Sequence, residues 1–150
     1  MPSGAVRSLL VLPLAGALLA GCGFVGASDV SHNKPSGFVL RGRVTVPAAG
    51  SGPIADGTAC MSALPGVAAG SIVKVSDVDG HELARGELGG GVTATTAAGS
   101  SAATCDFPFQ VRAVPGGVSR YAVSVAGRPA QTFAAAALRQ DQLAVLVLTS

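Results

Sequence analysis

The sequence has few of the side chains that most catalytic and nucleic-acid-binding sites use. It lacks tryptophan, has one tyrosine and five phenylalanines, and only 12% of its 150 residues are charged. Its ten lysines and arginines are scattered, so no basic cluster of the kind that binds nucleic acid is present. It has no Cys-x-x-Cys, Gly-x-Ser-x-Gly or His-Glu-x-x-His motif. These absences disfavour a nucleic-acid partner, a zinc or redox centre and the common hydrolases.

The apolar run near the start is too short to be a membrane span. Arg7 supplies a positive charge, and residues 8–20 are almost wholly apolar but include Pro13 and Gly16. A spanning helix needs about 20 apolar residues. A basic start, a short apolar run and small residues after it are typical of a secretory signal peptide. We therefore expect residues 1–21 to be a signal peptide and the mature protein to be extracytoplasmic.

The signal ends at a cysteine. Leu19, Ala20 and Gly21 precede Cys22, and the four residues resemble the lipobox of bacterial lipoproteins, in which a peptidase cuts before a cysteine whose thiol carries diacylglycerol. The resemblance implies a mature chain that begins at Cys22 and is held in the cell membrane by the lipid on its thiol. Two or three acyl chains are enough for stable anchoring. The alternative is an ordinary signal peptide with a chance cysteine near its end.

The segment after the cysteine is polar and contains glycine, serine and proline without a regular period. We expect residues 22–37 to be a lipidated, flexible tether. As a coil, its fifteen residues after Cys22 have an end-to-end distance on the order of 20 Å. The folded domain is expected over residues 38–150.

In that domain, apolar and polar residues alternate almost wherever a period exists. In residues 38–46, Leu40 and Val44 fall on one face while Arg41 and Arg43 fall on the other. This pattern predicts a half-buried strand. Similar patterns predict further strands over residues 71–78, 81–88, 105–112, 121–125, 131–134 and 143–149.

Three of these strands carry additional information. Asp79 and Gly80 separate two of them, and Asp-Gly favours a two-residue hairpin loop of type I′. Pro108 cannot donate a backbone hydrogen bond, so its strand is expected at an edge, or bonded on one side only at that point. Residues 143–149 are apolar on both faces, which predicts a central strand covered on both sides.

The arrangement of segments predicts the fold class. Residues 47–57 and 89–104 are rich in small residues and indicate exposed loops, and only residues 133–140 have helical composition. Seven or eight short strands with frequent turns predict an all-β Greek-key sandwich, immunoglobulin-like or prealbumin-like, with at most one short helix. The Asp-Gly hairpin, the Cys-x-Phe-x-Phe and Tyr-x-Val strands and the apolar final strand resemble small prealbumin-like or carboxypeptidase-regulatory-like domains of secreted bacterial proteins. That resemblance implies a binding or structural module without an active site.

The other two cysteines are expected to pair. With Cys22 assigned to a lipid, Cys60 and Cys105 remain, and an extracytoplasmic location permits their oxidation. The disulfide would close a loop of about 46 residues, which is worth roughly 4 kcal/mol in the chain-entropy model. A redox or metal role is disfavoured, because the spacing is not Cys-x-x-Cys and no histidine cluster accompanies the pair.

The two histidines lack the neighbours that catalysis requires. His32 lies in the expected tether and His81 beside the expected hairpin tip. His81 adjoins Glu82, but adjacent strand residues point to opposite faces. We therefore expect both histidines to be solvated, and we assign no catalytic residue.

The Asp-Gly hairpin also resembles part of a calcium-binding loop. Asp77 and Asp79 precede Gly80, but aligning that glycine with an EF-hand places Val75 and Gly86 where carboxylates are required. The sequence therefore predicts no metal site.

Two further groups have an ordinary structural interpretation beside a functional one. Phe107, Phe109 and Tyr121 could line a ligand cavity, but with so few aromatic residues they are expected in the core. Arg41 and Arg43 could contact a wall polymer or anionic lipid, but they are expected to form the solvated side of a strand.

These observations favour a membrane-anchored extracytoplasmic lipoprotein that acts as a non-catalytic binding or scaffolding module of the cell envelope. Its expected partners are the membrane, through the Cys22 lipid, and an envelope protein, polymer or lipid; no cofactor is expected. The alternative is a carrier of a lipid or small hydrophobic ligand. A small hydrolase assembled from Asp and Ser groups is a third class, which nothing in the sequence favours.

Overall fold

The predicted alternation of buried and exposed residues builds the first strand. The computed structural model describes residues 36–50, 55–94 and 103–149. In strand β1 (Phe38–Pro47), Leu40 and Val44 are fully buried whereas Arg41 and Arg43 are exposed. Successive side chains of a strand point to opposite sides, so β1 has one face in the core and one in solvent.

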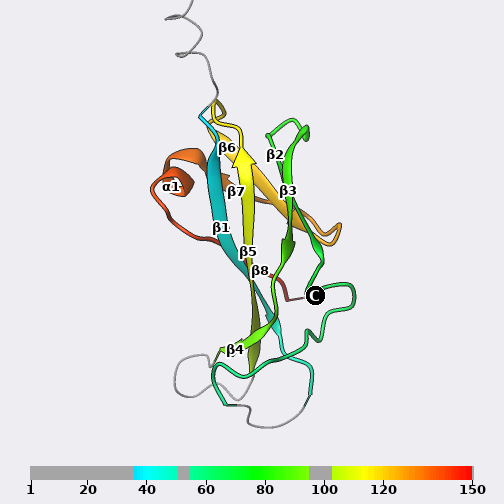
Figure 1. Cartoon of the computed structure of the whole chain (residues 1–150). Coiled ribbons are helices and arrows are strands. Elements are labelled where there is room, and N and C mark those ends of the chain that lie inside the picture. The colour runs from blue at the N-terminus through cyan, green and yellow to red at the C-terminus, as the bar shows by residue number, and fades with distance from the viewer. Residues whose placement is uncertain (1–35, 51–54, 95–102, 150) are drawn as a thin grey trace, which may run out of the picture. The chain divides into compact units, whose positions relative to one another are not determined.

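Within the described residues, eight strands form a single sheet (Figure 1). The strands after β1 are β2 (Ile72–Ser76), β3 (Glu82–Leu88), β4 (Val92–Ala94), β5 (Thr104–Val114), β6 (Arg120–Val125), β7 (Gln131–Ala134) and β8 (Ala144–Val147). Their order is β7-β6-β2-β3-β5-β1-β8, and β4 pairs with β5. β1 and β8 run parallel, whereas the other pairs are antiparallel.

The sheet contains a Greek key and is nearly closed into a barrel. The hairpin β2-β3 continues to β5, and β6 then returns to lie beside β2, which is the Greek-key order. The two outermost strands lie close to each other: the Gln131 side-chain amide of β7 donates to the Val147 carbonyl of β8 at 3.2 Å. The one helix of the described residues, α1 (Ala135–Arg139), connects β7 to β8. The predicted all-β fold class, with Greek-key order and one short helix, is confirmed.

The core is built mainly from valine with a few larger side chains. Tyr121 is fully buried; its hydroxyl donates to the Pro115 carbonyl at 2.8 Å and its ring meets Phe38 edge-on at 5.5 Å. Phe107 and Phe109 are also buried, so the prediction that they and Tyr121 belong to the core is confirmed. The other fully buried large side chains are Leu40, Leu146, Val44, Val46, Val73, Val75, Val111, Val114, Val123 and Val125.

The β2-β3 hairpin is present, but its predicted turn type is wrong. The Asp77 carbonyl accepts from the Gly80 N–H at 3.2 Å, and the Asp77 N–H donates to the His81 carbonyl at 3.0 Å. Gly80 has a φ of +89°, whereas Asp79 does not have positive φ. This is a three-residue loop with a glycine bulge, not a type I′ loop. The Asp77 carboxylate explains the difference, because it accepts from the Asp79 N–H at 3.0 Å and so stabilises an Asx turn.

The last strand is at an edge, so the prediction of a central strand is wrong. β8 stands at the end of the strand order and pairs with β1. Leu143 and Val147 are 53% and 56% exposed, while Ala144 and Leu146 face the core. Apolar side chains on the outer face of the strand therefore stay in contact with solvent, which an apolar run alone does not reveal.

Residues 89–104, predicted as one long loop, contain a strand. β4 pairs with the start of β5 through Val92↔Asp106, Thr93↔Cys105 and Ala94↔Thr104. Three residues without a clear apolar period gave no strand signal, so this part of the loop prediction is wrong. Residues 51–54 and 95–102 of the two predicted loops lie outside the described residues.

Pro108 lies in the interior of the sheet, so the edge alternative is wrong. β5 has β1 on one side and β3 and β4 on the other. Pro108 falls where β3 has ended at Leu88 and β4 has not begun, and its carbonyl accepts from the Gly89 N–H at 2.7 Å. A residue's N–H and C=O point to the same side in an antiparallel ladder, so no ladder bond is lost. The one-sided alternative is correct.

The two ends of β1 lie at opposite ends of the domain (Figure 1). Phe38 pairs with Val114, while Val46, eight residues further along β1, pairs with Cys105. At about 3.3 Å per residue the strand is roughly 30 Å long. The chain therefore enters the sheet far from Cys105.

No helix within the described residues is long and apolar enough to cross a membrane.

Candidate functional site

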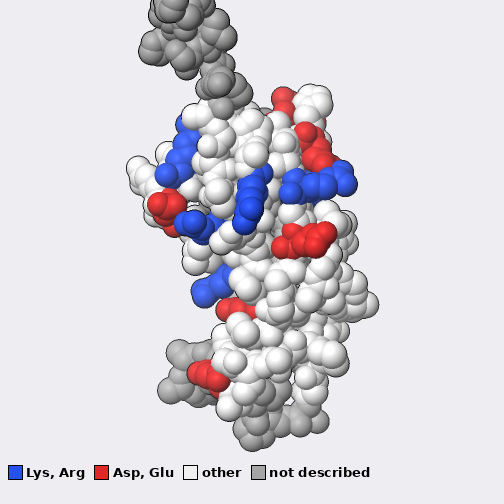
Figure 2. Space-filling view, viewed as in Figure 1, with Lys and Arg blue, Asp and Glu red and all other residues white. Residues whose placement is uncertain are grey.

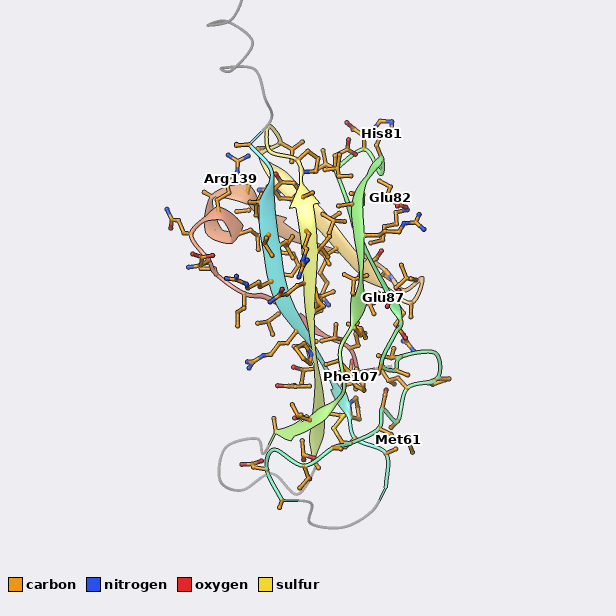
Figure 3. The ribbon with its side chains drawn as sticks, in the orientation of Figure 1. Met61, His81, Glu82, Glu87, Phe107 and Arg139 are labelled. Carbon is orange, nitrogen blue, oxygen red and sulfur yellow. A yellow bond between two sulfur atoms is a disulfide. The ribbon has the colours of Figure 1, made fainter. Side chains whose placement is uncertain are left out.

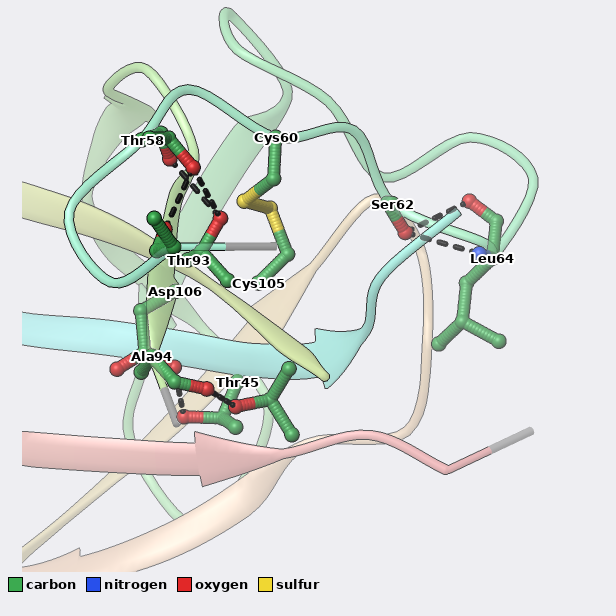
Figure 4. The surroundings of a disulfide bond; sticks show 11 residues. Thr45, Thr58, Cys60, Ser62, Leu64, Thr93, Ala94, Cys105 and Asp106 are labelled. Atoms are coloured by element: carbon green, nitrogen blue, oxygen red, sulfur yellow. Dashed lines mark hydrogen bonds between the residues drawn. A yellow bond between two sulfur atoms is a disulfide. The ribbon is translucent and has the colours of Figure 1, made fainter. Parts of the chain in front are cut away.

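Cys60 and Cys105 form the predicted disulfide (Figure 4). Their Cα atoms lie 5.9 Å apart, and Cys105 is fully buried as the second residue of β5. The Cys60 N–H donates to the Gly91 carbonyl at 3.1 Å. A Cβ on Gly91 would lie 2.7 Å from the Cys105 sulfur, so only glycine fits beside the disulfide. The bond ties the loop before β2 to β5.

Threonine hydroxyls hold the backbone around the disulfide (Figure 4). The Thr93 hydroxyl donates to the Thr58 carbonyl at 3.0 Å, and the two hydroxyls lie 3.2 Å apart. On the neighbouring strand, the Thr45 hydroxyl donates to the Asp106 carboxylate at 2.7 Å. These bonds satisfy the polar groups near the disulfide, which fits a structural role for it.

An apolar cavity of about 620 Å³ lies beside the disulfide, and we call it the disulfide pocket. Ser62 is its one polar side chain among the described residues, and the Ser62 hydroxyl is occupied by the backbone of Leu64. Met61 stands at the cavity with 74% of its surface exposed (Figure 3). The lining residues are Ala59, Cys60, Met61, Ser62, Leu64, Pro65, Gly66, Val67, Ala68, Ala69, Gly90, Gly91 and Phe107. Such a lining suits a small apolar group.

No pattern in the sequence indicates the disulfide pocket. Its apolar residues between positions 59 and 69 follow no period of 2 or 3.6, so they match neither a strand nor a helix. The disulfide and β4 bring this loop over Phe107. Only the cysteine pairing hinted that the loop would be fixed to the sheet.

A second, open hollow lies on the outer face of the sheet, and we call it the arginine groove. Its volume is about 860 Å³, and four guanidinium groups line it, from Arg41 and Arg43 of β1, Arg85 of β3 and Arg112 of β5. Glu87 of β3 is its one acidic side chain. Figure 2 shows basic and acidic side chains interspersed on this face, and Figure 3 marks Glu87 there.

Two arginines of the groove are held weakly. Arg41 lies 3.7 Å from Asp141, and Arg43 lies 3.7 Å from Asp106. The two arginine side chains are 54% and 50% exposed; Asp141 is 86% exposed, whereas Asp106 is 14% exposed. An exposed pair such as Arg41–Asp141 contributes about 0 to 1 kcal/mol. Arg112 has no ion pair within the described residues.

The third paired arginine has a closer partner. Arg85 donates to Glu82 from Nε at 2.7 Å and from a second guanidinium nitrogen at 2.6 Å. Glu82 is therefore a partner of Arg85, not of its neighbour His81. The sequence singled out Arg41 and Arg43 on this face but not Arg112, because the register of β5 against β1 cannot be known from one strand.

At the hairpin tip, His81 has an orienting partner that sequence reasoning missed. Its ring Nδ1 lies 3.0 Å from the Asp77 carboxylate, which also accepts from the His81 N–H at 2.9 Å. Desolvation opposes ionisation of Asp77, but the hydrogen bonds from the His81 backbone and ring and the charge of that ring outweigh it, so the pKa of Asp77 is lowered. The feature of the sequence that could have indicated this pair is the spacing of four positions between Asp77 and His81 across the turn.

Asp79 completes a small exposed cluster with this pair. One ligand atom from each of Asp77, Asp79 and His81 lies within 4.8 Å of the others. The Asp77 carboxylate is already used by the turn, through the N–H groups of Asp79 and His81. The three residues therefore explain the conformation of the hairpin without a bound ion.

The proposed lipidation residue Cys22 and His32 lie outside the described residues. The described part of the chain thus contributes three places of interest: the disulfide pocket, the arginine groove and the Asp77–His81 pair. No family model, curated protein or solved structure matches this chain.

Proposed function

We propose that this protein is a membrane-anchored extracytoplasmic lipoprotein whose β domain is a non-catalytic binding module of the cell envelope. The observation that carries the proposal is the sequence Leu19-Ala20-Gly21-Cys22 directly after a short apolar run. A thiol at that position is the group that takes a lipid, because a thiolate is the strongest nucleophile among the side chains nearby.

The disulfide supports an oxidising location. Disulfides persist outside the cytoplasm and are rare inside it. Cys60 and Cys105 are joined, which leaves Cys22 as the one thiol in the sequence without a cysteine partner. One cysteine for a lipid and two for a bridge account for all three.

The geometry supports binding more than catalysis. The arginine groove offers guanidinium donors and the disulfide pocket offers an apolar lining, whereas His81 stands on an exposed turn. Acid–base catalysis needs a positioned base beside a bound substrate, and His81 lines neither the arginine groove nor the disulfide pocket.

The anchor is tested on the whole chain with its own leader, produced in a bacterial host. Intact-mass measurement of protein extracted from washed membranes is expected to show a chain that begins at Cys22 and carries acyl groups. The Cys22→Ser variant is expected to lose the acyl mass and the detergent-dependent extraction. A wild-type product with an unmodified Cys22 contradicts the proposal.

A second candidate function is transport of a small hydrophobic ligand. The disulfide pocket favours it, because the volume of about 620 Å³ lies within the usual range for ligand sites and its lining carries no charge. Native mass spectrometry of the purified protein is expected to show a copurified apolar molecule. The variant Ala68→Phe, which adds bulk at the lining, should lose that molecule, while Ala130→Phe outside the pocket should keep it. A wild-type protein without bound species rules out the carrier.

A further inference from the structure

We propose that the arginine groove binds the phosphodiester headgroup of an anionic phospholipid and so holds the outer face of β1, β5 and β3 against the membrane. The inference rests on the proposed function for the nearness of that membrane, but the headgroup chemistry is carried by the groove itself. In this proposal, the headgroup phosphate is the ligand of Arg41, Arg43 and Arg112.

The donors fit a phosphate. A guanidinium group presents a rigid fork that binds two phosphate oxygens together. Arg112 has no ion pair within the described residues, and the carboxylates near Arg41 and Arg43 lie 3.7 Å away, beyond hydrogen-bond distance. The Arg41–Asp141 pair is exposed on both sides and is easily exchanged for a bidentate anion. Asp106 is only 14% exposed, but it already accepts a hydrogen bond from the Thr45 hydroxyl beside its contact with Arg43. Three guanidinium groups are therefore available in one hollow.

Glu87 indicates what accompanies the phosphate. Its carboxylate lines the same groove and has no ion pair within the described residues. A purely polyanionic ligand would be repelled by it, whereas a hydroxyl-bearing headgroup can donate to it. Gln110 pairs with Glu87 on β3 and with Arg41 on β1, so it supplies a further polar group between them. The groove thus suits a phosphoglycerol headgroup, in which a phosphodiester adjoins hydroxyls.

The two rims of the groove are apolar. Ile72 of β2 pairs with Glu87 and is 46% exposed. On the opposite side, Leu143 comes directly before β8 and is 53% exposed. Cations beside exposed apolar side chains are typical of protein surfaces that lie at the boundary between headgroups and acyl chains.

The short distance in sequence between Cys22 and β1 limits how far this face can lie from a membrane that holds Cys22. Thirteen residues, 23–35, separate Cys22 from the first described residue, Ser36, and even fully extended they reach no more than about 45 Å. The tether leads directly into β1, which carries Arg41 and Arg43 on its exposed face. A tether of this length keeps headgroups at a high effective concentration around the groove.

Other macromolecules fit the groove less well. β1, β3 and β5 each lie between two other strands of the sheet, so they offer no free edge at which a peptide could add as a strand. Phe109 is the one aromatic residue of the groove and is 4% exposed, so bases of a single-stranded nucleic acid have no ring to stack on.

The test measures how fast phenylglyoxal modifies each arginine of the whole, acylated chain in vesicles, read by peptide mass spectrometry. The vesicles are phosphatidylcholine, with or without phosphatidylglycerol. In the anionic vesicles, Arg41, Arg43 and Arg112 should react about tenfold more slowly, since each arginine near an anionic surface contributes to binding. Arg120 and Arg139, which do not line the groove, should react at the same rate in both. Equal rates for the groove arginines, or equal slowing of all five, overturns the proposal.

A charge-matched pair of variants tests the groove directly. Arg41→Gln with Arg112→Gln should abolish the protection of Arg43 in anionic vesicles, whereas Arg120→Gln with Arg139→Gln should leave it unchanged. An intact disulfide and an unchanged circular dichroism spectrum show that each variant is folded. If the double groove variant does not fold, Arg112→Gln alone takes its place, and it should reduce the protection of Arg43. Protection of Arg43 that survives in both folded groove variants contradicts headgroup binding.

Two further arms separate the possible failures. In the first, soluble polyphosphate is added to the chain in phosphatidylcholine vesicles. If polyphosphate slows the modification of the groove arginines and phosphatidylglycerol does not, the groove binds an anionic polymer and the lipid proposal is overturned. If intact mass shows no acyl group, the same chain is mixed with preformed vesicles. Protection by phosphatidylglycerol then supports the groove while the anchor fails, and lack of protection overturns both.

Discussion

At the scale of single residues, the packing beside the disulfide distinguishes two neighbouring glycines. Gly91 is buried, and a side chain there would meet the Cys105 sulfur at 2.7 Å and the Cys60 carbonyl at 2.8 Å. Gly90 next to it faces open space. The sequence Gly89-Gly90-Gly91 does not distinguish Gly91 from Gly90, because the difference between them arises from the Cys60 loop, which is distant in the chain.

We predict that Gly91→Ala lowers the free energy of unfolding by about 1–3 kcal/mol, the usual cost of forcing atoms into a packed interior. The matched variant Gly90→Ala should change it by less than about 0.5 kcal/mol. Urea denaturation of the oxidised proteins measures both. Equal stabilities of the two variants would show that the Cys60 loop can move aside.

A second residue-scale prediction concerns pH. The pKa of Asp77 is lowered below its ordinary value of 3.8, since the hydrogen bonds to His81 and the charge of its ring outweigh the opposing desolvation. A lowered pKa in the folded state means that the ionised carboxylate stabilises the fold above about pH 4 and that this contribution is lost as the pH falls further.

The wild-type protein should therefore be more stable than Asp77→Asn at neutral pH, and the difference should shrink below about pH 4. Asp79→Asn, which leaves the Asp77 carboxylate in place, is the control and should retain the wild-type pH profile. Urea denaturation at a series of pH values measures it. A difference between wild type and Asp77→Asn that is constant down to the lowest pH contradicts the assignment.

At the scale of elements, the sequence predicted strands well and their neighbours poorly. The two-faced patterns of β1 and β5 gave their positions to within a few residues, because burial on one face leaves a period of two. The predicted turn type of the hairpin was wrong, because the Asp77 side chain, not the Asp-Gly pair, determines the conformation of the loop. The edge position of β8 and its parallel pairing with β1 depend on the whole sheet, so no local pattern encodes them.

The same limit explains the candidate sites. Arg41 and Arg43 were visible as one face of a strand, but the groove also needs Arg85 and Arg112 from two other strands. The disulfide was predictable, because it followed from counting cysteines and from the expected extracytoplasmic compartment. The pocket beside it was not, since it depends on where the aperiodic loop before β2 crosses the sheet.

The disulfide itself gives an element-scale prediction. Replacing Cys60 and Cys105 together by alanine should lower the free energy of unfolding by roughly 4 kcal/mol, because the unfolded chain regains the freedom of a long loop. Thermal denaturation followed by circular dichroism measures the loss, and the reduced wild-type protein should behave alike. A variant as stable as the oxidised protein would mean that the loop before β2 is held by its hydrogen bonds alone.

At the scale of the whole molecule, a side-chain hydrogen bond crosses the seam between β7 and β8, where the sheet nearly closes. The Gln131 amide donates to the Val147 carbonyl, in place of the continuous ladder that joins the other strands. We predict that Gln131→Ala speeds amide hydrogen exchange in β7 and β8 while costing only about 1 kcal/mol of global stability.

The control for this prediction is Gln110→Ala on β5, where the backbone is paired on both sides. It should leave exchange in β7 and β8 unchanged. Exchange–mass spectrometry distinguishes the two variants. If both leave exchange in those strands unaltered, other contacts keep the seam shut.

The parallel pair β1–β8 also affects the order in which the chain can fold. All the other strands lie between these two in sequence, yet β8 covers the side of β1 that β5 leaves open. Contacts this distant in sequence form late. As the chain is synthesised from its N-terminus, β1 must therefore wait with an unpaired edge, which is prone to aggregate, until the final strand is available. Anything that delays the emergence of β8 prolongs that vulnerable interval.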